Sequence, residues 1–186
     1  MISEIAPSGP QSDLIYVGRL IEHKNIDQFI RAVKHVKSEI PDVKVLIVGD
    51  GPEIDNLKLL AREMDLDQNI SFLGFVEDYN YALALMKSSR IFVSPSTREG
   101  FGMAALEANA CGIPVVTVNH DMNAVMDLIS KDTGLICQPE EEDLSRAILT
   151  LLLGQSINKE RCINAAKEYD WDAVCNRAER VYEQTS

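Results

Sequence analysis

The chain has 186 residues, 18 of them basic and 29 acidic, so its formal net charge is −11. This acidic balance disfavours a surface that binds nucleic acid or an anionic membrane, because phosphate groups would be repelled. The length suits one globular domain rather than two, no apolar run approaches the ~18 residues of a membrane span, and the N-terminus shows no signal-peptide pattern.

The predicted elements alternate along the chain. Residues 1–12 contain Pro7, Gly9 and Pro10 and are interpreted as a linker, which leaves 13–186 as the domain. Short apolar runs predict strands at 14–17, 43–48, 70–73, 91–93, 114–118 and 133–137. Apolar residues at helical spacing predict helices at 26–38, 53–66, 79–87, 102–111, 123–129, 140–153, 157–168 and 171–184.

This order predicts an α/β fold with a doubly wound, six-stranded parallel Rossmann-like sheet and helices on both faces. Ligands of such sheets bind beyond the carboxyl ends of the strands. The loops at 18–25, 49–53, 74–78, 94–102 and 119–123 are therefore the places to look for a site.

The loop at 94–102 carries the strongest signal. Glu99-Gly100-Phe101-Gly102 stands between a strand and a helix, where glycines allow close backbone approach and free helical N–H groups can bind an anion. Glu107 follows Glu99 by eight residues, about 12 Å if the intervening chain is helical. That separation is too long for a hydrolase-type carboxylate pair, and it suits two hydroxyl-bearing groups at the ends of one extended ligand. Alternatively, Glu99 starts the helix and Glu107 is solvated.

Two cations lie in the first strand-to-helix loop. Arg19 and Lys24 would project from the carboxyl end of a strand, where they could neutralise a diphosphate. Each residue alone could equally be a solvated surface charge.

Other cofactor sites are not supported by the sequence. Gly100-x-Gly102-x-x-Ala105 fits a dinucleotide fingerprint, but six residues separate it from the preceding strand and the first loop of the domain lacks it. The four cysteines form no Cys-x-x-Cys pair, so we expect reduced thiols and no metal site.

A series of motifs resembles one enzyme family. The series comprises Val17-Gly18-Arg19-Leu20, Lys24-Asn25, Gly49-Asp50-Gly51-Pro52, Leu73-Gly74-Phe75-Val76, Ser94-Pro95-Ser96, Glu99-Gly100-Phe101-Gly102, Glu107-Ala108 and Ala110-Cys111-Gly112-x-Pro114-Val115. It is similar to the donor-binding half of family 4 (group 1) retaining glycosyltransferases, over roughly residues 13–184. The resemblance implies a GT-B enzyme, in which two Rossmann-like domains face each other and the second binds a UDP- or GDP-linked sugar without a metal or other cofactor.

The resemblance also implies roles for individual residues. Arg19 and Lys24, beside Gly18, would hold the diphosphate and stabilise its charge as it departs. Glu99 would bind hydroxyls of the transferred sugar, and Glu107 the ribose hydroxyls. The remaining donor-binding positions would be Gly100, Phe101, Gly102 and Met103 near sugar and phosphate, and Phe75 and Val76 near the base. Arg19, Lys24 and Glu99 are thus the catalytic candidates.

The sequence departs from the family in two respects. Many relatives carry Gly-Gly-x-x-Glu where this chain has Asn119 to Ala124, which leaves the identity of the hexose open. No acceptor-binding N-terminal half is present, and the helix at 171–184 resembles the one that packs on that half. We therefore expect a cytoplasmic donor-binding domain that is inactive alone. The full enzyme would act in polysaccharide or glycolipid synthesis, and a peripheral association with a membrane is compatible with this role. The alternatives are an epimerase-like enzyme and a stand-alone sugar-nucleotide-binding or scaffold subunit.

Overall fold

Six apolar runs form one sheet in the computed structural model, which describes residues 2–154 and 157–185. The neighbouring strands are all parallel, in the order β3-β2-β1-β4-β5-β6. The strands are β1 (Ser12–Val17), β2 (Val45–Val48), β3 (Ile70–Gly74), β4 (Ser89–Ser94), β5 (Val115–Val118) and β6 (Gly134–Cys137). The predicted six-stranded Rossmann-like sheet is confirmed.

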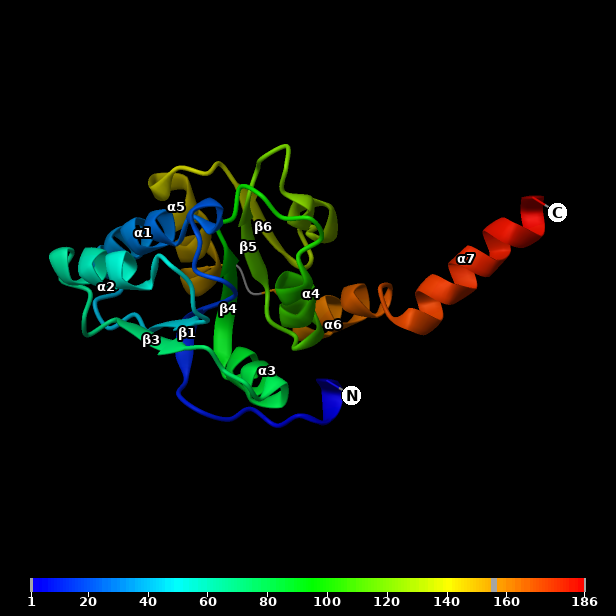
Figure 1. The fold of residues 1–186 in the computed structure, drawn as a ribbon, viewed down its shortest axis with the longest axis horizontal. Coiled ribbons are helices and arrows are strands. Elements are labelled where there is room, and N and C mark those ends of the chain that lie inside the picture. Colours follow the sequence, from blue (N-terminus) through cyan, green and yellow to red (C-terminus); the bar gives the residue numbers. More distant parts are fainter. Residues whose placement is uncertain (1, 155–156, 186) are drawn as a thin grey trace.

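Helices cover both faces of this sheet (Figure 1). They are α1 (Ile26–Glu39), α2 (Ile54–Glu63), α3 (Tyr79–Lys87), α4 (Met103–Ala110), α5 (Glu141–Leu153), α6 (Lys159–Lys167) and α7 (Trp171–Thr185). Three short 3-10 helices are η1 (Ile2–Glu4), η2 (Glu22–Lys24) and η3 (Ala124–Leu128). The segment expected as a helix at 123–129 is therefore a 3-10 helix.

Two separate apolar cores follow from the alternation of side chains along the buried strands. Leu14 of β1 packs with α1, α2 and α5 on one face. Its neighbour Ile15 points to the other face and packs with α3 and α4. Because β2 and β5 are buried on both faces, their sequences are continuous apolar runs rather than alternating ones, whereas the edge strands β3 and β6 keep exposed positions.

The two central strands are longer than their apolar runs. Ser12 of β1 and Ser89 of β4 are paired in the ladder, and their hydroxyls lie 2.8 Å apart. Arg90 of β4 reaches Asp13 of β1 at 3.0 Å. Cross-strand partners thus satisfy polar groups that the hydropathy pattern alone places outside the strands.

The segment before β1 lies along α3. Lys87, in the last turn of α3, donates hydrogen bonds of 2.6 Å to the carbonyls of Ile2 and Ile5. Both isoleucines pack against the core on that face. The residues interpreted as a linker therefore have defined contacts with the domain.

Helix α7 extends away from the rest of the domain (Figure 1). Its first residue, Trp171, is 79 % exposed, and Val174 one turn later is 37 % exposed. Neither side chain is buried in this chain. In the part of the chain that the structure describes, no helix is long and apolar enough to cross a bilayer.

Candidate donor-binding site

The candidate site lies where β1 and β4 run side by side and their connections diverge to opposite edges of the sheet. The loops that follow these two strands are joined by hydrogen bonds. The His23 carbonyl accepts from the Thr97 amide at 3.2 Å and from the Ser96 hydroxyl at 3.1 Å. Asn25, at a left-handed φ of 50°, donates from Nδ2 to the Pro95 carbonyl and the Thr97 hydroxyl.

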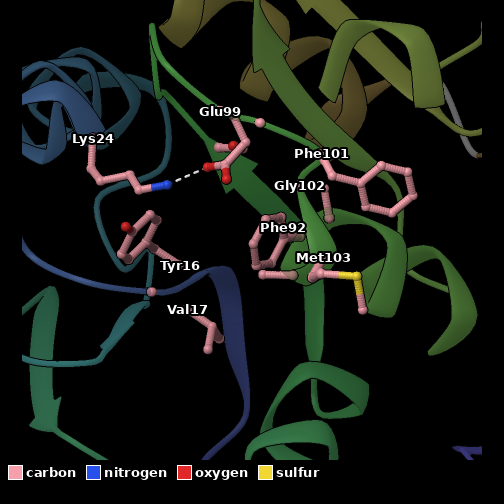
Figure 2. A pocket seen from close by; sticks show the side chains of 13 residues that line it. Tyr16, Val17, Lys24, Phe92, Glu99, Phe101, Gly102 and Met103 are labelled. Atoms are coloured by element: carbon pink, nitrogen blue, oxygen red, sulfur yellow. Dashed lines mark hydrogen bonds and ion pairs between the residues drawn. The ribbon is translucent and has the colours of Figure 1, made fainter. Parts of the chain in front are cut away.

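A cavity of about 340 Å³ opens between these loops (Figure 2). Lys24 and Glu99 form an ion pair at its edge, although 75 residues separate them in the sequence. Their side chains are 17 % and 23 % exposed, so both charges are partly shielded from water. Seven of the predicted site residues line this cavity: Gly18, Lys24, Glu99, Gly100, Phe101, Gly102 and Met103.

Helix α4 points its N-terminus at the cavity. Gly102 precedes its first residue, Met103, and has a left-handed φ of 91° that favours glycine. A Cβ on Gly102 would lie 2.4 Å from a methyl group of Val125, so the close packing of η3 also requires glycine. Because the helix begins only at Met103, the residues from Glu99 to Gly102 are not helical. The 12 Å estimate for the two carboxylates, which assumed a helix throughout, therefore does not apply.

Tyr16 is a site residue that the sequence did not single out. It is buried and lines the cavity (Figure 2). Its hydroxyl donates a hydrogen bond of 2.9 Å to the carbonyl of Arg19. Its burial, with a further contribution from the charge of Glu99, raises the pKa of the phenol. Tyr16 therefore stays a neutral donor and fixes the path of the loop that carries Arg19.

Arg19 itself lies on the surface, outside the residues that line the cavity. Within residues 2–154 and 157–185, its guanidinium forms no ion pair or hydrogen bond. Its five N–H donors are thus available to an anion at the edge of the site.

Glu107 lies in a neighbouring groove rather than in the cavity. This groove has a volume of about 460 Å³, and Met103 lines both hollows. Glu107 is half-buried, and burial raises the pKa of its carboxyl group. The Tyr79 hydroxyl donates a hydrogen bond of 2.7 Å to Glu107 Oε1, which acts against that rise. Tyr79 is a second residue that the sequence did not single out.

Phe75 and Val76 follow Gly74, whose φ of 71° turns the chain at the end of β3. The Phe75 side chain is 75 % exposed, whereas Val76 packs against the core. An exposed ring on a loop at the carboxyl edge of the sheet can offer an apolar surface to a planar group.

The segment that departs from the family pattern is held by Asn123. Asn123 is 1 % exposed, donates from Nδ2 to the Thr117 hydroxyl at 3.1 Å and the Val118 carbonyl at 2.7 Å, and accepts from the Val125 amide at 3.2 Å. Backbone hydrogen bonds then join this segment to Glu99, whose amide donates to the Met122 carbonyl at 2.9 Å. The Asn123 side chain thus supports the loop that presents the Glu99 carboxylate.

A group of metal-ligand residues occurs elsewhere, between α1 and α5. His35, Glu141 and Glu142 bring ligand atoms within 4.8 Å of one another. Arg31 approaches Glu141 at 4.0 Å and competes with a cation for that carboxylate. None of these residues lines the cavity between the loops that follow β1 and β4.

Comparison with known proteins identifies relatives of nearly the whole chain. The model of the family "Glycosyl transferases group 1" matches residues 3–169. The gpi3 component of the phosphatidylinositol N-acetylglucosaminyltransferase of Schizosaccharomyces pombe is 28 % identical over 91 % of this chain and 38 % of its own length. A GDP-mannose-dependent phosphatidylinositol dimannoside mannosyltransferase of Mycobacterium tuberculosis is 29 % identical over 85 % of this chain and 40 % of its own.

A similar fold occurs in the pneumococcal O-GlcNAc transferase GtfA, whose structure was solved with UDP and GlcNAc. The TM-score is 0.81 at 18 % identity, over 97 % of this chain and 37 % of that one. The chain thus spans about 40 % of the length of these curated relatives.

Proposed function

Because this chain belongs to the group 1 glycosyltransferases, we propose that it binds the nucleotide-diphosphate-sugar donor of a retaining hexosyltransferase. The observation that carries this proposal is the cavity between the loops that follow β1 and β4. There a cation from one loop and a carboxylate from the other meet at the N-terminus of a helix. A cation, a carboxylate and a helix N-terminus next to one another support binding of a phosphate and of a sugar hydroxyl at neighbouring positions.

Each site residue then has a role in donor binding. Arg19 and Lys24 bind the diphosphate and stabilise the negative charge that it gains when the sugar leaves. The amides of Phe101, Gly102 and Met103 donate to sugar or phosphate oxygens. Glu99 accepts hydrogen bonds from sugar hydroxyls. In the absence of donor, its pairing with Lys24 compensates for the partial burial of both charges.

The nucleoside extends from the cavity past Met103. Glu107 accepts hydrogen bonds from the ribose in the neighbouring groove, and the base lies against Phe75 and Val76. The pneumococcal neighbour was solved with UDP and the mycobacterial relative is named for GDP-mannose, so both nucleotides are probes for this chain.

The chain supplies one of the two domains of a GT-B enzyme in this proposal. The missing partner is an acceptor-binding domain, and the exposed helix α7 packs on it. The chain alone therefore binds donor without transferring the sugar. All four cysteines are free thiols, which favours a reducing compartment such as the cytoplasm.

Titration calorimetry of the chain with UDP, GDP and their hexose conjugates tests the proposal. We expect binding of at least one nucleotide. Arg19→Ala and Lys24→Met should each weaken it about tenfold, because each removes a charged contact to phosphate. Arg62→Ala is the matched control, since Arg62 lies on α2 and pairs with Asp67.

Three results would contradict the proposal. Absence of binding by folded protein would remove donor binding altogether. Equal affinity of the Arg19, Lys24 and Arg62 variants would remove the assigned roles. Sugar transfer or epimerisation by the chain alone would show that it is not half of a two-domain transferase.

A further inference from the structure

The groove beside Met103 is mostly apolar and contains a hydrogen-bonded pair of polar side chains. Met103, Leu106 and Ala110 of α4 line it together with Trp171. Within this groove, the Tyr79 hydroxyl donates to Glu107 Oε1 at 2.7 Å. A carboxylate in such surroundings requires a donor, and Tyr79 supplies one from a different helix.

The hydrogen bond from Tyr79 occupies only one of the two oxygens of the Glu107 carboxylate. Among the residues that the structure describes, Glu107 Oε2 accepts no hydrogen bond and Glu107 forms no ion pair. Tyr79 is 55 % exposed, so a ligand can reach the pair from the groove. The carboxylate is therefore oriented by one oxygen and can accept from a ligand with the other.

Tyr79 is held in place by the start of its helix. It is the first residue of α3, and Asp78 caps the helix by accepting the Asn80 amide at 2.9 Å. One turn later Leu83 is buried in the core that α3 shares with α4. The Cys111 thiol, directly after α4, donates to the Leu83 carbonyl at 3.7 Å. The phenol therefore extends from an anchored helix end towards Glu107.

We infer that Tyr79 is a positioning residue for recognition of the ribose, which makes this chain selective for ribonucleoside over deoxyribonucleoside diphosphates. Its hydroxyl holds Glu107 Oε1 so that Oε2 faces the ribose hydroxyls. This inference rests on the proposed function, in which Glu107 binds the ribose. The inference adds that the contribution of Glu107 to binding depends on Tyr79 of α3.

The test compares UDP and GDP with their 2′,3′-dideoxy forms by calorimetry. Wild type should bind the ribonucleotide more tightly. Tyr79→Phe, which keeps the ring, should weaken the ribonucleotide about fivefold to tenfold and leave the dideoxynucleotide unchanged. Tyr81→Phe is the matched control, because it makes the same change on the same helix near Gly9 rather than near Glu107. Thermal unfolding verifies that each variant is folded.

The outcomes separate the two proposals. Absence of nucleotide binding by wild type, or equal affinity for the two forms, contradicts the proposed function or its assignment of Glu107. If wild type discriminates and Tyr79→Phe discriminates equally well, the inference is overturned. Equal weakening of both nucleotides by Tyr79→Phe also overturns it, because Tyr79 would then act on the base or on the fold. If Tyr79→Phe causes no further loss of ribonucleotide affinity in the Glu107→Gln background, the result supports the inference.

Discussion

Replacing Asn123 by Ala is expected to lower the free energy of unfolding by about 2–4 kcal/mol. The side chain is 1 % exposed and forms hydrogen bonds to Thr117, Val118 and Val125. Truncation leaves the Val118 carbonyl and the Val125 amide without this partner, at about 1–3 kcal/mol for each buried group. The Thr117 hydroxyl loses less, because it still donates to the Ser94 carbonyl at 3.0 Å.

Urea denaturation measures this change, and a thermal scan should show a midpoint lower by roughly 5–15 °C. Asn119→Ala is the control, since Asn119 is an exposed residue of the same loop and its backbone amide, not its side chain, bonds to Cys137. That variant should stay within about 0.5 kcal/mol of wild type.

A loss below about 1 kcal/mol for Asn123→Ala would refute the reasoning, because three buried hydrogen bonds should contribute more than one exposed bond. The donor site should respond as well. The Glu99 amide bonds to Met122, directly before Asn123, so the variant should weaken nucleotide-sugar binding under conditions in which it is folded.

Three further results are expected. Gly102→Ala should lower the free energy of unfolding in urea by roughly 1–3 kcal/mol, because the φ of Gly102 is 91° and an added Cβ would lie 2.4 Å from a methyl group of Val125. Gly100→Ala is the control and should be nearly neutral, because no atom lies within 4 Å of its added Cβ. Equal losses of stability in the two variants would contradict the argument. The exposed Cys175 should react with a thiol reagent before the buried Cys111, because burial raises the pKa of Cys111 to about 11. Cys175→Ser should therefore abolish the fast phase of thiol labelling. Burial raises the pKa of Glu107 above its usual 4.5, so its charge lowers stability at pH 7 and this cost disappears as the pH falls through the raised pKa. Glu107→Gln should therefore raise the urea midpoint at about pH 7 but not at about pH 4, and a gain independent of pH would argue against buried charge as the cause.

The sequence alone was sufficient for the architecture. Its apolar runs and helical spacings determine six strands and the helices between them, and right-handed crossovers then restrict the topology. It also singled out the loops that line the candidate cavity, because glycines and charges after a strand are local features of the chain. Element ends were less accurate, since Ser12 and Ser89 join their strands only through a partner across the ladder.

Only the tertiary structure decided which of these groups meet. The Lys24–Glu99 ion pair joins loops 75 residues apart, and no local pattern encodes such a contact. Asn123 and Tyr79 were missed for the same reason. An asparagine in a loop and a tyrosine at a helix start are ordinary in sequence, and their importance comes from the buried groups that they satisfy. Periodicity determines which face of an element is buried, whereas packing between distant elements determines which polar side chains find partners.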